Sequence, residues 1–189
     1  MTSSTPSRAA RARAPGSTTR IDDVVRITDG LHRVGNGPFT TELPGFEGER
    51  LLPGSARSSA PPRAPAPMRL ARPARAARYA ARVNGLTALA VTKLDVLSGM
   101  ERVPVCTAYR VDGEETAEFP VDVLDRAEPV LTPMEGWGHE LAAARTWDAL
   151  PATARRYLEA IEAATEVSVT LASVGADREA TVVRREVLA

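Results

Sequence analysis

Short runs of apolar residues and one helical repeat organise the second half of the chain. The uncharged runs over residues 86–91 and 167–172 each predict a buried strand. Between them, apolar residues recur at the spacing of one helix face, and Pro151 suits the first position of a helix, so we predict a helix over 151–164. Its buried face is expected to hold Ala154, Tyr157, Leu158 and Ile161.

Alternating residues predict a further strand over 103–110. The residues expected on one of its faces are Val103, Val105, Thr107 and Tyr109. A turn at 111–114 and a returning partner strand within 116–123 should follow, and 180–184 should form a last strand. Strand, helix and strand with short connections indicate an α/β fold, in which 83–110 and 165–185 supply strands of one sheet with the helix packed on it.

Two segments lack the large apolar residues that a core requires. Residues 1–20 and 51–77 are rich in Ala, Arg, Pro and Ser, and such segments bury too little surface to offset the entropy of ordering. We therefore expect both to be disordered, with residues 21–50 between them and an α/β part over 78–189.

The zero net charge of the chain hides an uneven distribution. Residues 1–82 carry 14 arginines and no lysine against six acids, a balance that a nucleic-acid- or other anion-binding arm would show. The arginine cluster of residues 57–82 has a single aromatic residue, Tyr79, and no recognisable module, which disfavours that alternative. Cys106, the single cysteine, excludes an internal disulfide framework and is expected to be a buried thiol. His32 and His139 have no partner at ligand spacing, so no metal site is predicted.

The residues that are candidates for ligand binding follow the first apolar run, in Thr92-Lys93-Leu94-Asp95. A carboxylate has two acceptor oxygens, which match the adjacent N1–H and amine donors of guanine. A lysine stem can lie along a flat base while its ammonium remains solvated. Adenine presents a different pattern, so a lysine and an aspartate two residues apart at a strand end are suited to selecting GTP over ATP.

The surrounding sequence resembles the C-terminal part of the adenylosuccinate synthetase family. The motifs that carry the resemblance, in chain order, are Arg33-Val34-Gly35-Asn36-Gly37-Pro38-Phe39, Val83-Asn84-Gly85-Leu86-Thr87, the Lys93 tetrapeptide, Val105-Cys106-Thr107-Ala108-Tyr109-Arg110, Pro133-Met134-Glu135-Gly136-Trp137 and Ser173-Val174-Gly175-Ala176-Asp177-Arg178. The likeness is dense over 83–189, good over 20–50 and absent over 51–77.

The resemblance implies a role for particular residues. The positions that match guanine-binding residues of the family are Lys93, Leu94, Asp95, Ser173, Val174 and Gly175. Val174 stands where the family usually has threonine, which puts a hydroxyl contact there in doubt. Thr2 matches a residue that binds IMP. The implied fold is the C-terminal part of the family's mixed-sheet, P-loop-NTPase-like architecture.

The resemblance also implies an activity. The family is a cytoplasmic, homodimeric ligase of AMP biosynthesis that joins IMP to L-aspartate with GTP and Mg²⁺. Its glycine-rich phosphate loop, catalytic aspartate and catalytic histidine belong to its N-terminal half. No Gly-Asp-Glu-Gly-Lys-type loop occurs in the chain, so we expect these 189 residues to be inactive alone. The alternative is a non-catalytic GTP-, anion- or nucleic-acid-binding module.

The genetic code accounts for the two atypical segments. Shifted by one or two bases, plausible GC-rich codons for 8–17 and about 53–77 encode a glycine-rich stretch and a Thr-Thr-Gly-Arg loop, both of which the family has at these places. We interpret these segments as out-of-frame translation. In the printed frame Pro61-Pro62-Arg63-Ala64 replace the loop, so its substrate chemistry is lost. Met1 is expected to be an internal codon of the gene.

Overall fold

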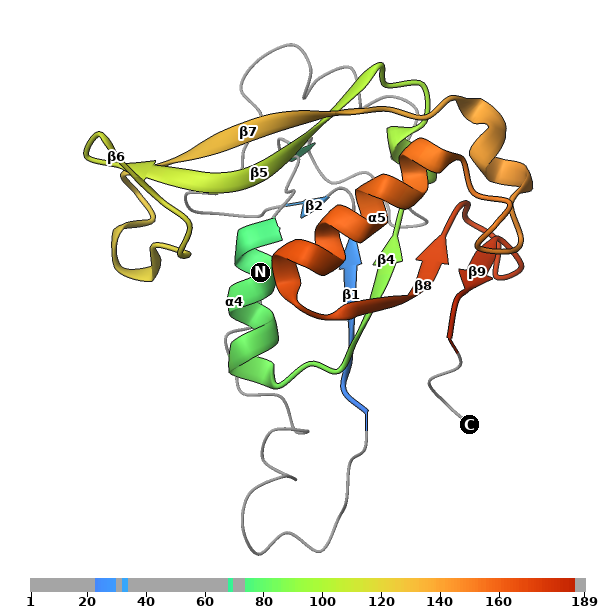
Figure 1. Ribbon diagram of the computed structural model, residues 1–189, viewed down its shortest axis with the longest axis horizontal. Coiled ribbons are helices and arrows are strands. Elements are labelled where there is room, and N and C mark those ends of the chain that lie inside the picture. Colours follow the sequence, from blue (N-terminus) through green and yellow to red (C-terminus); the bar gives the residue numbers. More distant parts are fainter. Residues whose placement is uncertain (1–22, 30–31, 34–67, 70–73, 186–189) are drawn as a thin grey trace, which may run out of the picture.

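The computed structural model describes residues 23–29, 32–33, 68–69 and 74–185. Its central feature is a four-stranded sheet in the order β1-β4-β8-β9 (Figure 1). The strands are β1 (Val25–Asp29), β4 (Ala88–Thr92), β8 (Ser168–Ser173) and β9 (Thr181–Val183). The first three strands run parallel and β9 is antiparallel to β8. The strands predicted from the apolar runs at 86–91, 167–172 and 180–184 are confirmed, with boundaries moved by one or two residues.

Two helices form the crossovers of this sheet. Helix α4 (Ala74–Asn84) lies between β1 and β4 in the chain, and α5 (Ala152–Thr165) precedes β8. Both crossovers move in the same direction along the sheet, so right-handed connections place both helices on one face, where they contact each other (Figure 1). The predicted helix is confirmed, and its buried residues include the four expected ones together with Thr165.

A second, antiparallel sheet stands apart from the first. It has the order β6-β5-β7, with β5 at Arg102–Val111, β6 at Glu114–Thr116 and β7 at Ala127–Glu135. The prediction that residues 83–110 feed one sheet is therefore wrong. Strand β4 already pairs with β1 on one side and β8 on the other, so no edge of β4 is left for β5.

The partner of β5 also differs from the prediction. Only Glu114–Thr116 returns as a strand, and Val121–Val123 forms a 3₁₀ turn (η2) after Pro120, which has no N–H for a ladder. The longer partner is β7, whose Pro129 and Pro133 argue against a strand in the sequence. They are tolerated because β7 is an edge strand.

The β5 ladder contains an irregularity at Thr107. Cys106 pairs with Leu131 and Ala108 with Val130, so Thr107 is an extra residue in the strand. The bulge reverses the alternation beyond it, and Tyr109 leaves the face of Val103 and Val105 to pack against Phe119 with ring centroids 5.7 Å apart. Cys106 is a buried thiol, as predicted.

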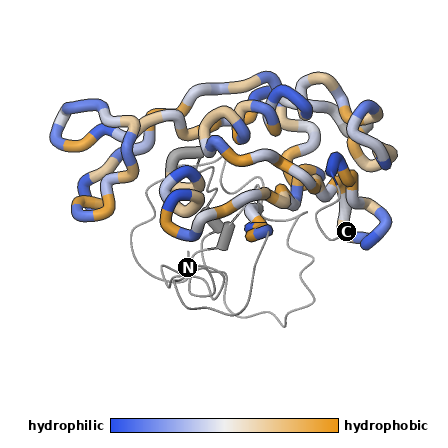
Figure 2. Tube along the Cα trace, turned by 60° about the horizontal axis from the view of Figure 1, so that its bottom comes forward, coloured by the Kyte–Doolittle hydropathy of each residue, from blue (hydrophilic) through white to orange (hydrophobic). Residues whose placement is uncertain are grey.

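The core lies between the two sheets and the helices. It contains Leu89 and Val91 of β4, Val103 of β5, Leu158 of α5 and Val169 of β8. Hydrophilic stretches lie at the left end of the coloured tube, along its top and beside the C-terminus (Figure 2). In the described part of the chain, no helix is long and apolar enough to cross a membrane.

Part of the segment 51–77, which we expected to be disordered, has secondary structure. Met68–Arg69 forms β3 and pairs with β2 (His32–Arg33), and α4 begins at Ala74. The other residues of that segment, and residues 1–20, lie outside the described ranges.

Candidate functional site

The two guanine-binding motifs predicted from the sequence meet at one edge of the parallel sheet. Lys93 directly follows β4, and Ser173 is the last residue of β8, the strand beside it. Because β4 and β8 are parallel, their carboxyl ends lie at the same edge (Figure 1). Ligands of open α/β sheets bind in this position, outside the carboxyl ends of the strands.

One backbone hydrogen bond joins the motifs directly. The Leu94 N–H donates to the carbonyl oxygen of Ser173 at 3.2 Å. The Leu94 side chain is fully buried in the core. Leu94 therefore anchors the turn, and Lys93 and Asp95 lie on either side of it.

Lys93 has a left-handed backbone conformation at the end of β4. It has a φ of 62° and is exposed to solvent. A left-handed conformation costs a non-glycine residue about 1–2 kcal/mol, so the surrounding structure must hold it in place. The strained residue thus coincides with the one whose stem is predicted to cover the base.

Asp95 begins the short 3₁₀ helix η1 (Asp95–Leu97). Its side chain is half-buried, so its carboxylate is partly shielded from water. Its carbonyl accepts from Ser98 N–H at 3.0 Å, and Leu97 N–H donates to Leu94 oxygen at 3.1 Å. The carboxylate therefore sits on a backbone that is hydrogen-bonded at both of its ends.

The turn after β8 has a rigid internal structure. Ser173 Oγ donates to the Gly175 carbonyl at 2.9 Å, and Val174 N–H donates to Ala180 oxygen at 2.9 Å. Gly175 lies close to Ala180, since a Cβ at Gly175 would be 3.0 Å from that of Ala180. The turn is thus closed on itself and packed against the residue that precedes β9.

Val174 occupies the position at which the family usually has threonine. Its side chain is fully buried and belongs to the core. A side chain in that orientation cannot place a hydroxyl on a ligand at the sheet edge. Of the Val174 backbone groups, the N–H already donates to Ala180 oxygen.

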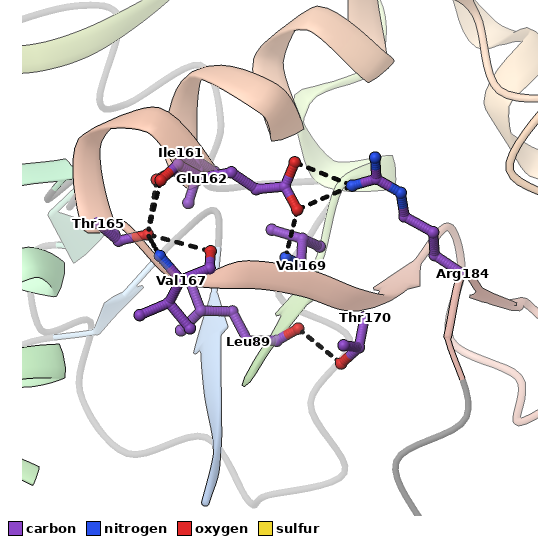
Figure 3. A network of polar contacts seen from close by, with 8 residues as sticks. All are labelled: Leu89, Ile161, Glu162, Thr165, Val167, Val169, Thr170 and Arg184. Atoms are coloured by element: carbon purple, nitrogen blue, oxygen red, sulfur yellow. Dashed lines mark hydrogen bonds and ion pairs between the residues drawn. The ribbon is translucent and has the colours of Figure 1, made fainter. Parts of the chain in front are cut away.

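A polar network supports β8 from behind (Figure 3). Glu162 Oε1 accepts from Val169 N–H at 2.6 Å, and Arg184 donates to both carboxylate oxygens at 2.8 and 2.9 Å. Thr170 is the extra residue of a bulge in β8, and its hydroxyl donates to Leu89 oxygen at 3.2 Å. These contacts connect β8 to α5, to β4 and to Arg184, the residue after β9.

Two clefts are lined by described residues, and neither lining includes residues 93–95 or 173–175. One, of about 650 Å³, is lined by residues 99–102 and 133–138. Another, of about 500 Å³, is lined by residues 166–170 together with Glu162, Arg184 and Arg185. The lining of the larger cleft includes Trp137, whose indole N–H donates to Leu94 oxygen.

Several predicted residues lie outside the described ranges. Thr2, residues 61–64 and the motif 34–43 belong to this group. Among the described residues, no group of three or more His, Cys, Asp or Glu side chains could hold a metal ion. The expectations for IMP and for the substrate loop remain predictions.

The sequence gives little indication of the part played by Trp137. Trp137 is 2% exposed and belongs to the core. Its indole N–H also donates to Leu94 oxygen at 3.2 Å. The only sequence signal was its position in Gly136-Trp137-Gly138 after a strand, where a tryptophan N–H needs a buried acceptor.

Comparisons with known proteins agree with one another. Residues 1–182 match the family described as adenylosuccinate synthetase. The adenylosuccinate synthetase of Sorangium cellulosum is 46% identical over 172 residues, covering 90% of this chain and 40% of the relative. That of Mycobacterium bovis is 42% identical over 192 residues, covering 100% of this chain and 44% of the relative.

A solved structure has the same fold. A chain from the structure of fully ligated adenylosuccinate synthetase from Plasmodium falciparum superposes with a TM-score of 0.78 at 27% identity. The match covers 90% of this chain and 42% of that one. The chain therefore spans about two fifths of the length of the relatives it matches.

Proposed function

The chain belongs to the adenylosuccinate synthetase family, and from that membership we propose that it supplies the guanine-recognition part of a GTP-dependent ligase. The reaction joins IMP to L-aspartate and gives adenylosuccinate, a step of AMP biosynthesis. The observation that carries the proposal is the hydrogen bond from Leu94 N–H to Ser173 oxygen, which unites two motifs far apart in the chain.

The turn after β4 is proposed to read the base. The Asp95 carboxylate accepts from the N1–H and the exocyclic amine of guanine, and the Lys93 stem covers one face of the ring. Leu94 contributes its buried side chain and its backbone, which fix the distance between the other two. Adenine lacks both donors at these positions, so GTP is selected over ATP.

The turn after β8 is proposed to complete the pocket through its backbone. Ser173, Val174 and Gly175 place peptide groups at the same sheet edge, and the internal Ser173–Gly175 hydrogen bond holds them rigid. Gly175 lets the turn pack closely against Ala180, which fixes its peptide groups at the edge where the base is proposed to bind.

The remaining parts of the ligase reaction are proposed from family membership, and no described residue is assigned to them. IMP, L-aspartate and the homodimer belong to this proposal, as do the cytoplasmic location and Thr2 as an IMP contact. Mg²⁺ would accompany the GTP phosphates. The described residues do not offer a metal site of their own, so no step is derived through the ion.

The proposal is tested by titrating the chain with GTP and ATP, followed by NMR. GTP should bind more tightly than ATP, and Asp95→Ala should weaken GTP binding by about 2–4 kcal/mol because two guanine donors lose their acceptor. Asp95→Asn should abolish the preference for guanine, since an amide offers one acceptor and one donor.

Asp122→Ala is the matched control. Asp122 is an exposed carboxylate in η2, next to the antiparallel sheet, and its removal should leave GTP binding unchanged. Equal affinities of the parent chain and the Asp95→Ala variant for GTP would remove the guanine-binding role from Asp95.

A further inference from the structure

Trp137 contacts both ends of the segment that carries Asp95. Its indole Nε1–H donates to Leu94 oxygen at 3.2 Å, and its own carbonyl accepts from Gly99 N–H at 3.1 Å. Trp137, which follows β7, therefore forms hydrogen bonds with both ends of the segment 94–99, and Asp95 lies between them.

Trp137 is itself held firmly. It is 2% exposed, and its ring lies 5.2 Å from that of Tyr157 on α5 at an interplanar angle of 51°. The preceding Gly136 donates its N–H to Glu101 oxygen at 2.9 Å, and a Cβ at Gly136 would overlap the Met100 carbonyl. Trp137 is therefore held by α5 on one side and by the residues just before β5 on the other.

The proposed guanine contact is sensitive to orientation. Two parallel hydrogen bonds to one carboxylate require that its plane matches the plane of the base, because hydrogen bonds weaken steeply away from linearity. A single hydrogen bond tolerates a rotated carboxylate. The hypoxanthine base of ITP keeps N1–H and lacks the exocyclic amine, so its binding depends less on the orientation of Asp95.

We propose that Trp137 is a positioning residue for guanine selectivity. Resting on the proposed function, this inference assigns Trp137 the task of orienting the segment 94–99 so that the Asp95 carboxylate meets both donors of guanine. Removal of the indole N–H then lowers the preference for GTP over ITP and leaves the weaker binding of ITP largely unchanged.

The test uses the full 189-residue chain and measures GTP and ITP affinities by NMR titration. Trp137→Phe keeps an aromatic ring against Tyr157 and removes the donor to Leu94. We expect about fivefold weaker GTP binding, the effect of one lost hydrogen bond, with ITP affinity changed by less than about twofold.

Trp147→Phe is the matched control. Trp147 packs against the same core, and its ring is covered by Arg184 at 4.2 Å from its centroid. This variant should keep the GTP-to-ITP ratio of the parent chain. Amide exchange of β4 and β8 in both variants checks that the fold is retained.

A second measurement needs no substitution. The chain has two tryptophans, so two indole N–H resonances report on the two sites. GTP should shift the Trp137 resonance more than ITP does, and should leave that of Trp147 in place. An unmoved Trp137 resonance during saturable GTP binding would contradict the inference even if Trp137→Phe failed to fold.

The outcomes separate the two claims. An unchanged GTP-to-ITP ratio in folded Trp137→Phe overturns the positioning role and leaves the proposed guanine site intact. A parent chain that prefers GTP neither over ITP nor over ATP overturns the proposed function, and the positioning role falls with it.

Discussion

The two sheets of the molecule contribute to the site in different ways. Strand β4 of the parallel sheet is buried along four consecutive residues, whereas no residue of β7 in the antiparallel sheet is fully buried. The first sheet holds the guanine motifs at its edge, and the second delivers Trp137 to fix one of them. In our proposal the buried sheet locates the guanine contacts, and Trp137, which follows a strand of the partly exposed sheet, refines their geometry.

The sharpest test of this difference is a matched pair of leucine truncations. Leu89→Ala in β4 removes a fully buried side chain and should destabilise the protein by about 2–5 kcal/mol. Leu131→Ala in β7 removes a half-buried side chain and should cost clearly less. Urea unfolding of both variants measures the two values, and equal losses would contradict the division of labour between the sheets.

The connection between the sheets is the next target. Gly136→Ala should destabilise the protein by about 1–3 kcal/mol, because the added Cβ overlaps the Met100 carbonyl and forces the backbone apart. Gly138→Ala, two residues later, meets open space and serves as the control. Thermal unfolding should separate the two variants, and a Gly136→Ala protein as stable as Gly138→Ala would show that the close approach is unimportant.

The network behind β8 should be less costly to disturb. Glu162→Gln replaces a charged acceptor shared by Val169 N–H and Arg184, and should destabilise the protein by about 1–2 kcal/mol. Glu159→Gln changes an exposed glutamate of the same helix and should be nearly neutral. Chemical denaturation measures both, and similar values would mean that the contacts of Glu162 contribute little to stability.

The smallest effect is expected in the turn of the antiparallel sheet. Arg126 pairs with Asp112 at 2.6 Å, but both side chains are more than half exposed. Arg126→Ala should change stability by no more than about 1 kcal/mol, and the difference should shrink in high salt. A larger, salt-independent loss would show that this sheet depends on its surface charges.

The parallel sheet was the more predictable half of the fold. The runs at 86–91 and 167–172 contain no charge because their strands are covered on both faces, so composition alone marks them. The helix over Ala152–Thr165 was predictable because its buried residues follow one face. The meeting of Lys93 and Ser173 at one edge then follows from parallel pairing.

The antiparallel sheet was harder to predict for reasons that lie in its ladder. The bulge at Thr107 reverses the alternation of β5, and such an extra residue has no local sequence signal. Pro129 and Pro133 make β7 hard to recognise, because prolines are accepted in a strand only at the edge of a sheet, and the sequence does not show which strand is at the edge. The indole hydrogen bond of Trp137 depends on both sheets being in place, so residue patterns within one segment cannot show it.

The long separation of the two site motifs has a kinetic consequence. Thr170 and Leu89, which join β8 to β4, are 81 residues apart, and the whole antiparallel sheet and α5 lie between them in the chain. Contacts of such long range form slowly because loop closure precedes any gain from pairing. The sheet edge at which we propose that guanine binds is therefore assembled in a late step of folding. The moment at which it forms during refolding would show when β4 and β8 pair.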